Sequence, residues 1–114
     1  MDRTKMDHLP LFDVASFFIA SKSTDYRLGI LLRAQVTADV FSELGISTVN
    51  LEQRYKTQPE TFRVNIGELT DEGLEFARIN YQRWLANSDR LKKEPTYEQL
   101  KQSLIRQWDK FKNG

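Results

Sequence analysis

The side chains that could carry out chemistry are few in this sequence, and they stand apart from one another. His8 is the only histidine and the chain has no cysteine, so it offers no histidine pair or thiolate for a metal and no sulfur nucleophile. A catalytic triad of serine, histidine and acid would depend on His8 alone, and the favoured interpretation of His8 is an ordinary surface histidine. The glycines are isolated and match no phosphate-binding loop. We therefore expect no enzyme, no metal and no cofactor.

Two pairs of carboxylates are close enough in sequence to share a proton or a cation. Asp71 and Glu72 are adjacent, and Asp39 and Glu43 are one helical turn apart. Acids in a first helical turn stabilise the positive end of the helix dipole, which explains the first pair. A solvated helix face explains the second pair. Such an acidic face could also attract a basic protein, so Asp39 and Glu43 are predicted partner-binding residues.

A basic and aromatic triplet, Arg54, Tyr55 and Lys56, is the strongest signal for nucleic acid. Its cations could contact a phosphate backbone while the ring stacks on a base or sugar. The favoured alternative is a solvated loop whose charge is offset by Glu52 and Glu60. If the chain binds nucleic acid, which is the second interpretation of these residues after a solvated loop, we predict that Arg54, Tyr55 and Lys56 are the residues that bind it.

The net charge gives no global attraction to nucleic acid or to an anionic membrane. Seventeen basic residues stand against sixteen acidic ones, a formal charge of +1. Residues 1–73 hold eight basic and eleven acidic residues, or −3, and residues 74–114 hold nine and five, or +4. We expect an acidic body followed by a basic C-terminal part.

The length of 114 residues is that of one domain. We predict a flexible N-terminus at 1–9, a helical domain at 10–87, a linker at 88–95 and an amphipathic helix at 96–112. The longest nearly apolar run, residues 9–20, is well short of the ~20 residues that cross a bilayer. No signal-peptide pattern is present, and we expect a cytoplasmic protein that does not enter the membrane.

Helical periodicity predicts the first part of the domain. A helix that begins near Pro10 is apolar on most sides, which is typical of a central buried helix. Residues 24–45 carry a helical stripe that ends at Gly45, a glycine stop followed by the apolar Ile46. They form one helix or two, and Thr37 as a possible N-cap slightly favours two.

After Gly45 the spacing of the apolar residues changes from the helical period to the alternation that is typical of β-strands. Residues 46–51 are rich in β-branched side chains, and Phe62, Val64 and Ile66 alternate with polar neighbours. These features predict a β-hairpin over 46–66 with the basic and aromatic triplet at its tip. The expected class is therefore α+β, predominantly helical, with one hairpin.

Two helices complete the prediction. Thr70 caps a helix that runs to about residue 87, and Thr96 with Gln99 has the spacing of a capping box for the last helix. The apolar stripe of the last helix has three possible fates: packing on the chain's own core, which is the commonest, a homodimer contact or a partner contact. The stripe consists of Tyr97, Leu100, Leu104, Trp108 and Phe111. Its aromatic members, Tyr97, Trp108 and Phe111, join the predicted partner-binding residues.

Helices, a hairpin with a basic tip and the step Leu69-Thr70-Asp71-Glu72-Gly73 follow one another in an order that resembles the winged helix-turn-helix family. The resemblance covers residues 10–87 and implies a helix-turn-helix at 24–36 and 37–45, a wing at 46–66 and DNA binding. The implied recognition helix, however, carries Asp39 and Glu43 and no basic residue, which is unfavourable beside phosphates. Winged helices also serve as protein-interaction modules, and an acidic face suits that use better.

The leading hypothesis is thus a non-enzymatic regulatory or adaptor protein that binds a protein partner. The alternative is a winged-helix transcriptional regulator that binds DNA, with a possible homodimer through the C-terminal helix.

Overall fold

The computed structural model describes residues 9–20, 23–88 and 95–113. The predicted class is confirmed: the fold is mostly helical, with one pair of antiparallel strands and an amphipathic C-terminal helix. The elements in chain order are β1 (Pro10–Asp13), α1 (Val14–Ala20), α2 (Thr24–Glu43), α3 (Leu51–Thr57), η2 (Pro59–Thr61), β2 (Arg63–Asn65), η3 (Ile66–Glu68), α4 (Asp71–Phe76), η4 (Ala77–Tyr81), α5 (Gln82–Ser88) and α6 (Tyr97–Asn113).

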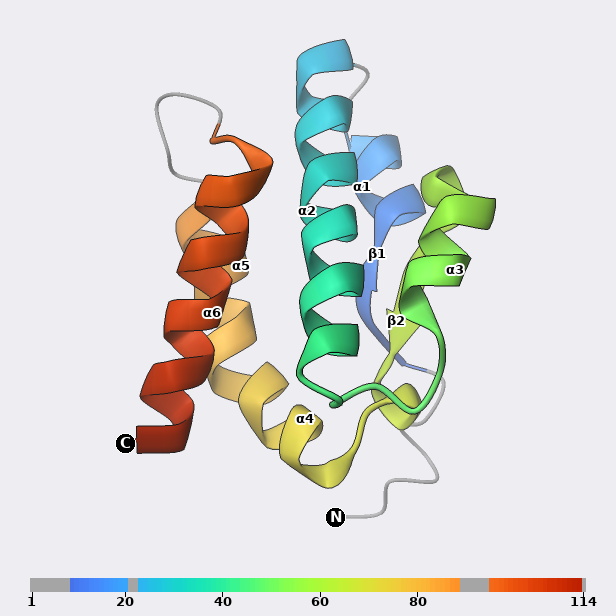
Figure 1. The fold of residues 1–114 in the computed structure, drawn as a ribbon. Coiled ribbons are helices and arrows are strands. Elements are labelled where there is room, and N and C mark those ends of the chain that lie inside the picture. The colour runs from blue at the N-terminus through green and yellow to red at the C-terminus, as the bar shows by residue number, and fades with distance from the viewer. Residues whose placement is uncertain (1–8, 21–22, 89–94, 114) are drawn as a thin grey trace.

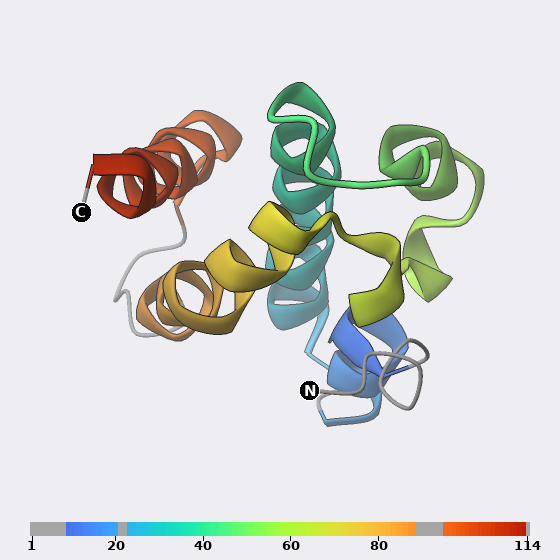
Figure 2. The same cartoon turned by 90° about the horizontal axis from the view of Figure 1, so that it is seen from below.

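Helix α2 is the centre of the fold. In Figure 1 it stands between α1 and α3 on one side and α5 and α6 on the other, and Figure 2 shows α4 crossing beneath it. Its buried side chains face several directions, as a central helix requires. They are Ile30, Arg33, Ala34, Val36, Thr37, Ala38, Val40 and Phe41.

The prediction of a central helix from Pro10 was wrong, because a strand precedes a short helix there. Phe12 is 2% exposed and its neighbours are only partly buried, which is the period of a strand. The carboxylate of Asp13 then accepts from the N–H of Ala15 at 3.2 Å and from Ser16 Oγ at 3.0 Å, and this local cap starts α1. Ile19, on α1, is 87% exposed.

Residues 24–43 form one helix, so the preference for two was wrong. Thr37 does not cap a second helix, because its hydroxyl donates to the carbonyl of Arg33 at 2.8 Å within α2. The predicted stop at Gly45 is confirmed. Its φ is +68°, and the N–H of Ile46 bonds to the carbonyl of Phe41 at 3.2 Å, as in a Schellman cap.

The predicted hairpin over 46–66 was also wrong. Asn50 accepts from the N–H of Gln53 at 3.0 Å and starts helix α3 in the middle of the expected hairpin. A strand does form at Arg63–Asn65, but it pairs with β1, with Phe12 opposite Val64. The helix-turn-helix and wing boundaries implied by the winged-helix resemblance are therefore wrong.

The last two predicted helices are confirmed. Thr70 accepts from the N–H of Gly73 at 3.0 Å and starts α4, which continues through the π-helical turn η4 into α5. Thr96 and Gln99 make both bonds of the capping box, at 2.9 and 3.2 Å. The apolar stripe of α6 packs on the core of its own chain, where Leu104 is fully buried.

Some expectations fall outside the described residues. They are the conformation of residues 1–8, with His8, and that of most of the linker, residues 89–94. Among the helices that the structure describes, none combines the length and apolar character needed to span a membrane.

Candidate functional site

A polar groove of about 570 Å³ lies between α3, η2 and β2. Its lining side chains are amides, hydroxyls and guanidiniums, all of which make hydrogen bonds. The amides and hydroxyls belong to Asn50, Gln53, Thr57, Gln58, Thr61 and Asn65, and the guanidiniums to Arg54 and Arg63.

The apolar side of α3 holds one wall of this groove in place. Leu51 is fully buried, and Tyr55 packs edge-on against Phe62 with ring centroids 5.8 Å apart. Pro59 then begins the 3₁₀ turn that leads the chain into β2. The wall on α3 and the wall on β2 are therefore fixed by short-range turns and a shared aromatic contact.

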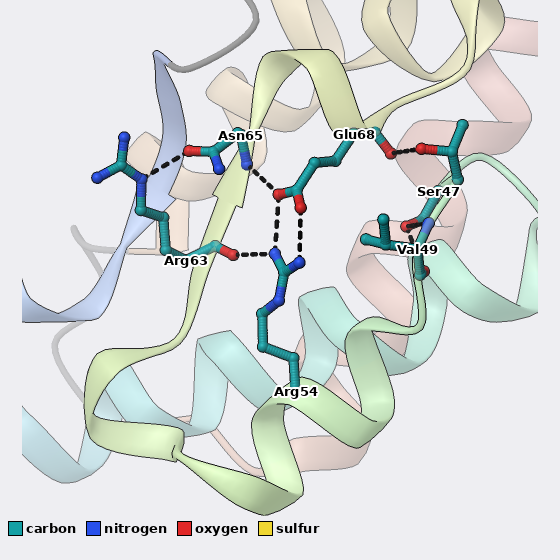
Figure 3. A network of polar contacts seen from close by, with 7 residues as sticks. Ser47, Val49, Arg54, Arg63, Asn65 and Glu68 are labelled. Atoms are coloured by element: carbon teal, nitrogen blue, oxygen red, sulfur yellow. Dashed lines mark hydrogen bonds and ion pairs between the residues drawn. The ribbon is translucent and has the colours of Figure 1, made fainter.

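Arg54 and Glu68 form a bidentate ion pair at the groove (Figure 3). Arg54 Nη1 donates to Glu68 Oε1 at 2.8 Å and Nη2 donates to Oε2 at 2.6 Å. The bond from Arg54 lowers the pKa of Glu68, with a further contribution from the N–H of Asn65, against the opposing effect of burial. The carboxylate is therefore charged well below neutral pH.

The same two side chains also bind the main chain of β2. Arg54 Nη1 donates to the carbonyl of Arg63 at 2.7 Å, and the N–H of Asn65 donates to Glu68 Oε1 at 2.9 Å (Figure 3). On the other edge of the strand, Phe62 accepts from Val14 in the β1–α1 segment. The ion pair thus covers the edge of β2 that β1 leaves open.

The predicted nucleic-acid-binding triplet is on helix α3 and not at a hairpin tip. Arg54 lines the groove, Tyr55 is partly buried against the core and Lys56 is exposed. Burial is the main cause of the raised pKa of Tyr55. The three side chains therefore meet different surroundings and do not form one basic and aromatic surface.

The tertiary structure brings three of the predicted partner-binding residues together between α2 and α6. Tyr97 Oη donates to Asp39 Oδ2 at 2.5 Å, and Lys101 Nζ donates to Glu43 Oε1 at 3.0 Å. Partial burial and then the bond to Asp39 raise the pKa of Tyr97. We call this contact between α2 and α6 the seam; it joins residues of the same chain.

Trp108 and Phe111 also make internal contacts. Their rings pack against Phe76 with centroid distances of 5.1 and 5.7 Å. Of the three alternatives for the apolar stripe of α6, these contacts correspond to packing on the chain's own core. A partner contact by Asp39, Glu43 or the aromatic residues of α6 stays a prediction.

Sequence reasoning missed Arg63, Asn65 and Glu68 as members of the site. A local signal was present, because Asn65 and Glu68 have the spacing of a capping box and make its bonds at the start of η3. That signal explains the turn. It does not reveal that Glu68 also pairs with Arg54, which is fourteen positions earlier.

A second, smaller cavity of about 230 Å³ lies between α1, α2 and α5. Phe17, Ile30 and Leu85 contribute its apolar lining, and Arg33 its charge. The guanidinium of Arg33 donates to the carbonyl of Gly29 at 2.8 Å and to Ser88 Oγ at 3.0 Å. These contacts connect α2 to the end of α5, and this structural role explains why the Arg33 side chain is buried.

The described residues contain no group of three or more acidic or histidine side chains placed to hold a metal ion. Comparisons with protein-family models, curated proteins and solved structures give no match. The groove between α3, η2 and β2 is therefore the candidate functional site.

Proposed function

We propose that this chain is a cytoplasmic regulatory or adaptor module that binds a segment of a protein partner in the polar groove. The observation that carries the proposal is the composition of the groove, whose lining donates and accepts hydrogen bonds beside the edge of a strand. Peptide segments offer both donors and acceptors at every residue, and they match such a lining.

The chemistry of the lining supports recognition more than acid–base catalysis. Amides, hydroxyls and guanidiniums keep their protons through the ordinary pH range. Asn50 and Gln53, for example, use their side chains to cap α3 and to contact Thr57 Oγ1, at 3.0 and 3.2 Å. The function that these groups favour is binding.

The electrostatics favour a peptide over nucleic acid. Tight binding to a phosphate backbone uses several cations, each of which neutralises a phosphate. The groove has two guanidiniums, and both are already engaged: Arg54 has a bidentate carboxylate partner, and Arg63 Nε donates to Asn65 Oδ1 at 2.6 Å. DNA binding is therefore the second outcome that the experiment must be able to detect.

The test is selection of peptides from a random display library against the immobilised full-length chain, followed by measurement of the affinity of the selected peptides. The decisive variant is Gln53→Glu, which places a charge of opposite sign in a lining that holds two arginines. Its matched control is Gln102→Glu, the same change at an exposed position of α6. We expect the first variant to change the affinity of the selected peptides and the second to leave it unchanged.

Three results would contradict the proposal. They are a library that yields no binder, binders that respond equally to both variants, and salt-dependent binding to duplex DNA in place of peptide. Analytical ultracentrifugation of the same samples reports whether the chain also forms the predicted dimer.

A further inference from the structure

The η4–α5 segment and α6 lie side by side, and two hydrogen bonds fix how they are aligned. Trp84 Nε1 donates to Ser103 Oγ at 2.8 Å, and Asn80 Nδ2 donates to the carbonyl of Gln107 at 3.3 Å. Because the residue numbers rise on one segment as they fall on the other, the two segments are antiparallel. One flank of their contact faces the core, and the other flank faces solvent.

Three cations lie on the solvent flank of this contact. Arg83 is on α5, Arg106 and Lys110 are on α6, and all three are exposed. A helix has about 3.6 residues per turn, so these positions are turned to the side of the contact away from the buried Tyr81 and Leu104. The three cations therefore share one surface.

These three cations have no partner within the described residues, unlike the two lysines of α6 that lie toward the chain's own acidic groups. Lys101 and Lys112 pair with Glu43 and Glu72 at 3.0 and 2.6 Å. The three cations form no such ion pair and no hydrogen bond there. The one acid within four positions of any of them is Asp109. Three positive charges less one negative charge leave an excess of two on this surface.

Ile79 adds an apolar contact to the same surface. It precedes Arg83 by four positions, which places both side chains on one flank, and it is 58% exposed. We call the surface formed by Ile79, Arg83, Arg106 and Lys110 the outer face. A phosphate backbone offers nothing that would bury an isoleucine, whereas an amphipathic protein helix presents carboxylates and apolar side chains together. The combination therefore favours a protein partner over nucleic acid.

We propose that the outer face binds an acidic amphipathic helix of a partner protein. Arg106 and Lys110 are one helical turn apart, about 6 Å along the axis, which is also the spacing of two glutamates one turn apart on a partner helix. Arg83 supplies a third cation from the neighbouring helix, and Ile79 contacts the apolar stripe of the partner.

The outer face is distinct from the polar groove, and this inference does not depend on the function proposed for the groove. Helix α3, which forms one wall of the groove, and α6 lie on opposite sides of α2 (Figure 1). The chain therefore has room for one partner segment on each side.

Binding is tested with synthetic helical peptides and the full-length chain, by isothermal titration calorimetry. The first peptide consists of alanine and glutamate with a stripe of leucine. The second replaces each glutamate by lysine, and the third replaces each leucine by alanine. We expect the first peptide to bind and the other two to bind at least roughly tenfold more weakly. A short DNA duplex serves as the fourth probe.

Charge reversal identifies the surface that binds. Arg106→Glu should weaken binding of the first peptide roughly tenfold and reduce its dependence on salt. The matched control is Lys56→Glu, which makes the same charge change at an exposed position of α3. The control should bind the peptide like the unmodified chain. Both positions are exposed, and circular dichroism checks that both variants fold.

Ile79→Ala tests the apolar contact separately from the charge. We expect it to weaken binding of the leucine peptide and to leave the weaker binding of the alanine version unchanged, because only the leucine peptide has a side chain to bury there. A loss of affinity that is equal for both peptides would overturn the apolar contact.

The other outcomes that overturn the proposal are equally definite. They are no binding of the first peptide, equal effects of Arg106→Glu and Lys56→Glu, and tighter binding of the lysine peptide. Binding of the DNA duplex that exceeds that of every peptide, and that Arg106→Glu weakens while Ile79→Ala does not, would identify nucleic acid as the partner in place of a protein.

Discussion

The hydroxyl of Tyr81 donates a hydrogen bond to Thr37 Oγ1, and their oxygens are 2.7 Å apart in the core between η4 and α2. The direction follows from Thr37, which gives its own hydrogen to the carbonyl of Arg33 at 2.8 Å. Both side chains are fully buried. Burial also raises the pKa of Tyr81, so the phenol stays neutral as a donor.

Replacement of Tyr81 by Phe should lower the free energy of unfolding by about 1–2 kcal/mol, because it removes a buried hydrogen bond and leaves Thr37 without its donor. Urea unfolding followed by circular dichroism measures the change. The control is Tyr55→Phe, since the hydroxyl of Tyr55 makes no hydrogen bond to the described residues. Equal effects of the two substitutions would contradict the prediction.

Gly73→Ala should destabilise the chain by about 1–3 kcal/mol through overpacking, although alanine is the better helix former. An added Cβ would be 2.7 Å from the carbonyl oxygen of Ile46 and 2.9 Å from its Cβ. Gly45→Ala provides the comparison, because Gly45 has open space around it but a φ of +68°. Thermal unfolding of both variants separates the cost of overpacking at Gly73 from the cost of a side chain at the positive φ of Gly45. A Gly73→Ala protein as stable as the parent would show that α4 does not pack so closely on Ile46.

Glu68 should make stability depend on acid pH. Its folded-state pKa is lowered, first of all by the hydrogen bond from Arg54, so its stabilising contribution is present above the unfolded pKa of about 4.3 and is lost as pH falls through the folded pKa. In that window the unfolded chain binds more protons, and stability rises with pH. We expect Glu68→Gln to be less stable than the parent at neutral pH and to match it more closely in acid. Urea titrations between about pH 3 and pH 7 test this, and parallel curves would contradict it.

Asp39 and Tyr97 should be energetically coupled across the seam. A hydrogen bond to a charged acceptor contributes about 1.5–3 kcal/mol, less where the pair is partly exposed. A double-mutant cycle of Asp39→Ala and Tyr97→Phe measures the coupling. Additive effects would show that the two side chains do not hold α6 on α2. Because the pKa of Tyr97 is raised, its contribution is present below the unfolded pKa of about 10 and is lost as pH rises through the folded value.

Glu43→Lys tests the acidic face as a partner surface. Glu43 has a side chain that is 52% exposed and pairs with Lys101 at 3.0 Å, so charge reversal should change stability by less than about 1 kcal/mol. We expect peptides that bind the groove to keep their affinity. A large loss of peptide affinity in a folded Glu43→Lys variant would show that the binding surface lies on α2 and the seam and not in the groove.

Local sequence signals determined the ends of several elements. The glycine stop at Gly45, the cap at Thr70 and the capping box that begins at Thr96 each concern hydrogen bonds between residues a few positions apart. Because such bonds depend little on the rest of the chain, they can be predicted from the sequence alone. The alternation around Val64 likewise predicted a strand at the right place.

The tertiary structure decided everything that joins distant residues. It chose β1 as the partner of β2, and it placed Arg54 on a helix that bonds to Glu68. It also brought Asp39 to Tyr97 across fifty-eight positions. Which partner a strand, a cation or a carboxylate takes depends on how the apolar faces pack around α2, because that packing alone sets the distances between segments far apart in the chain. The sequence thus determined the class and the caps, and only the packed structure decided the groove and its covered strand edge.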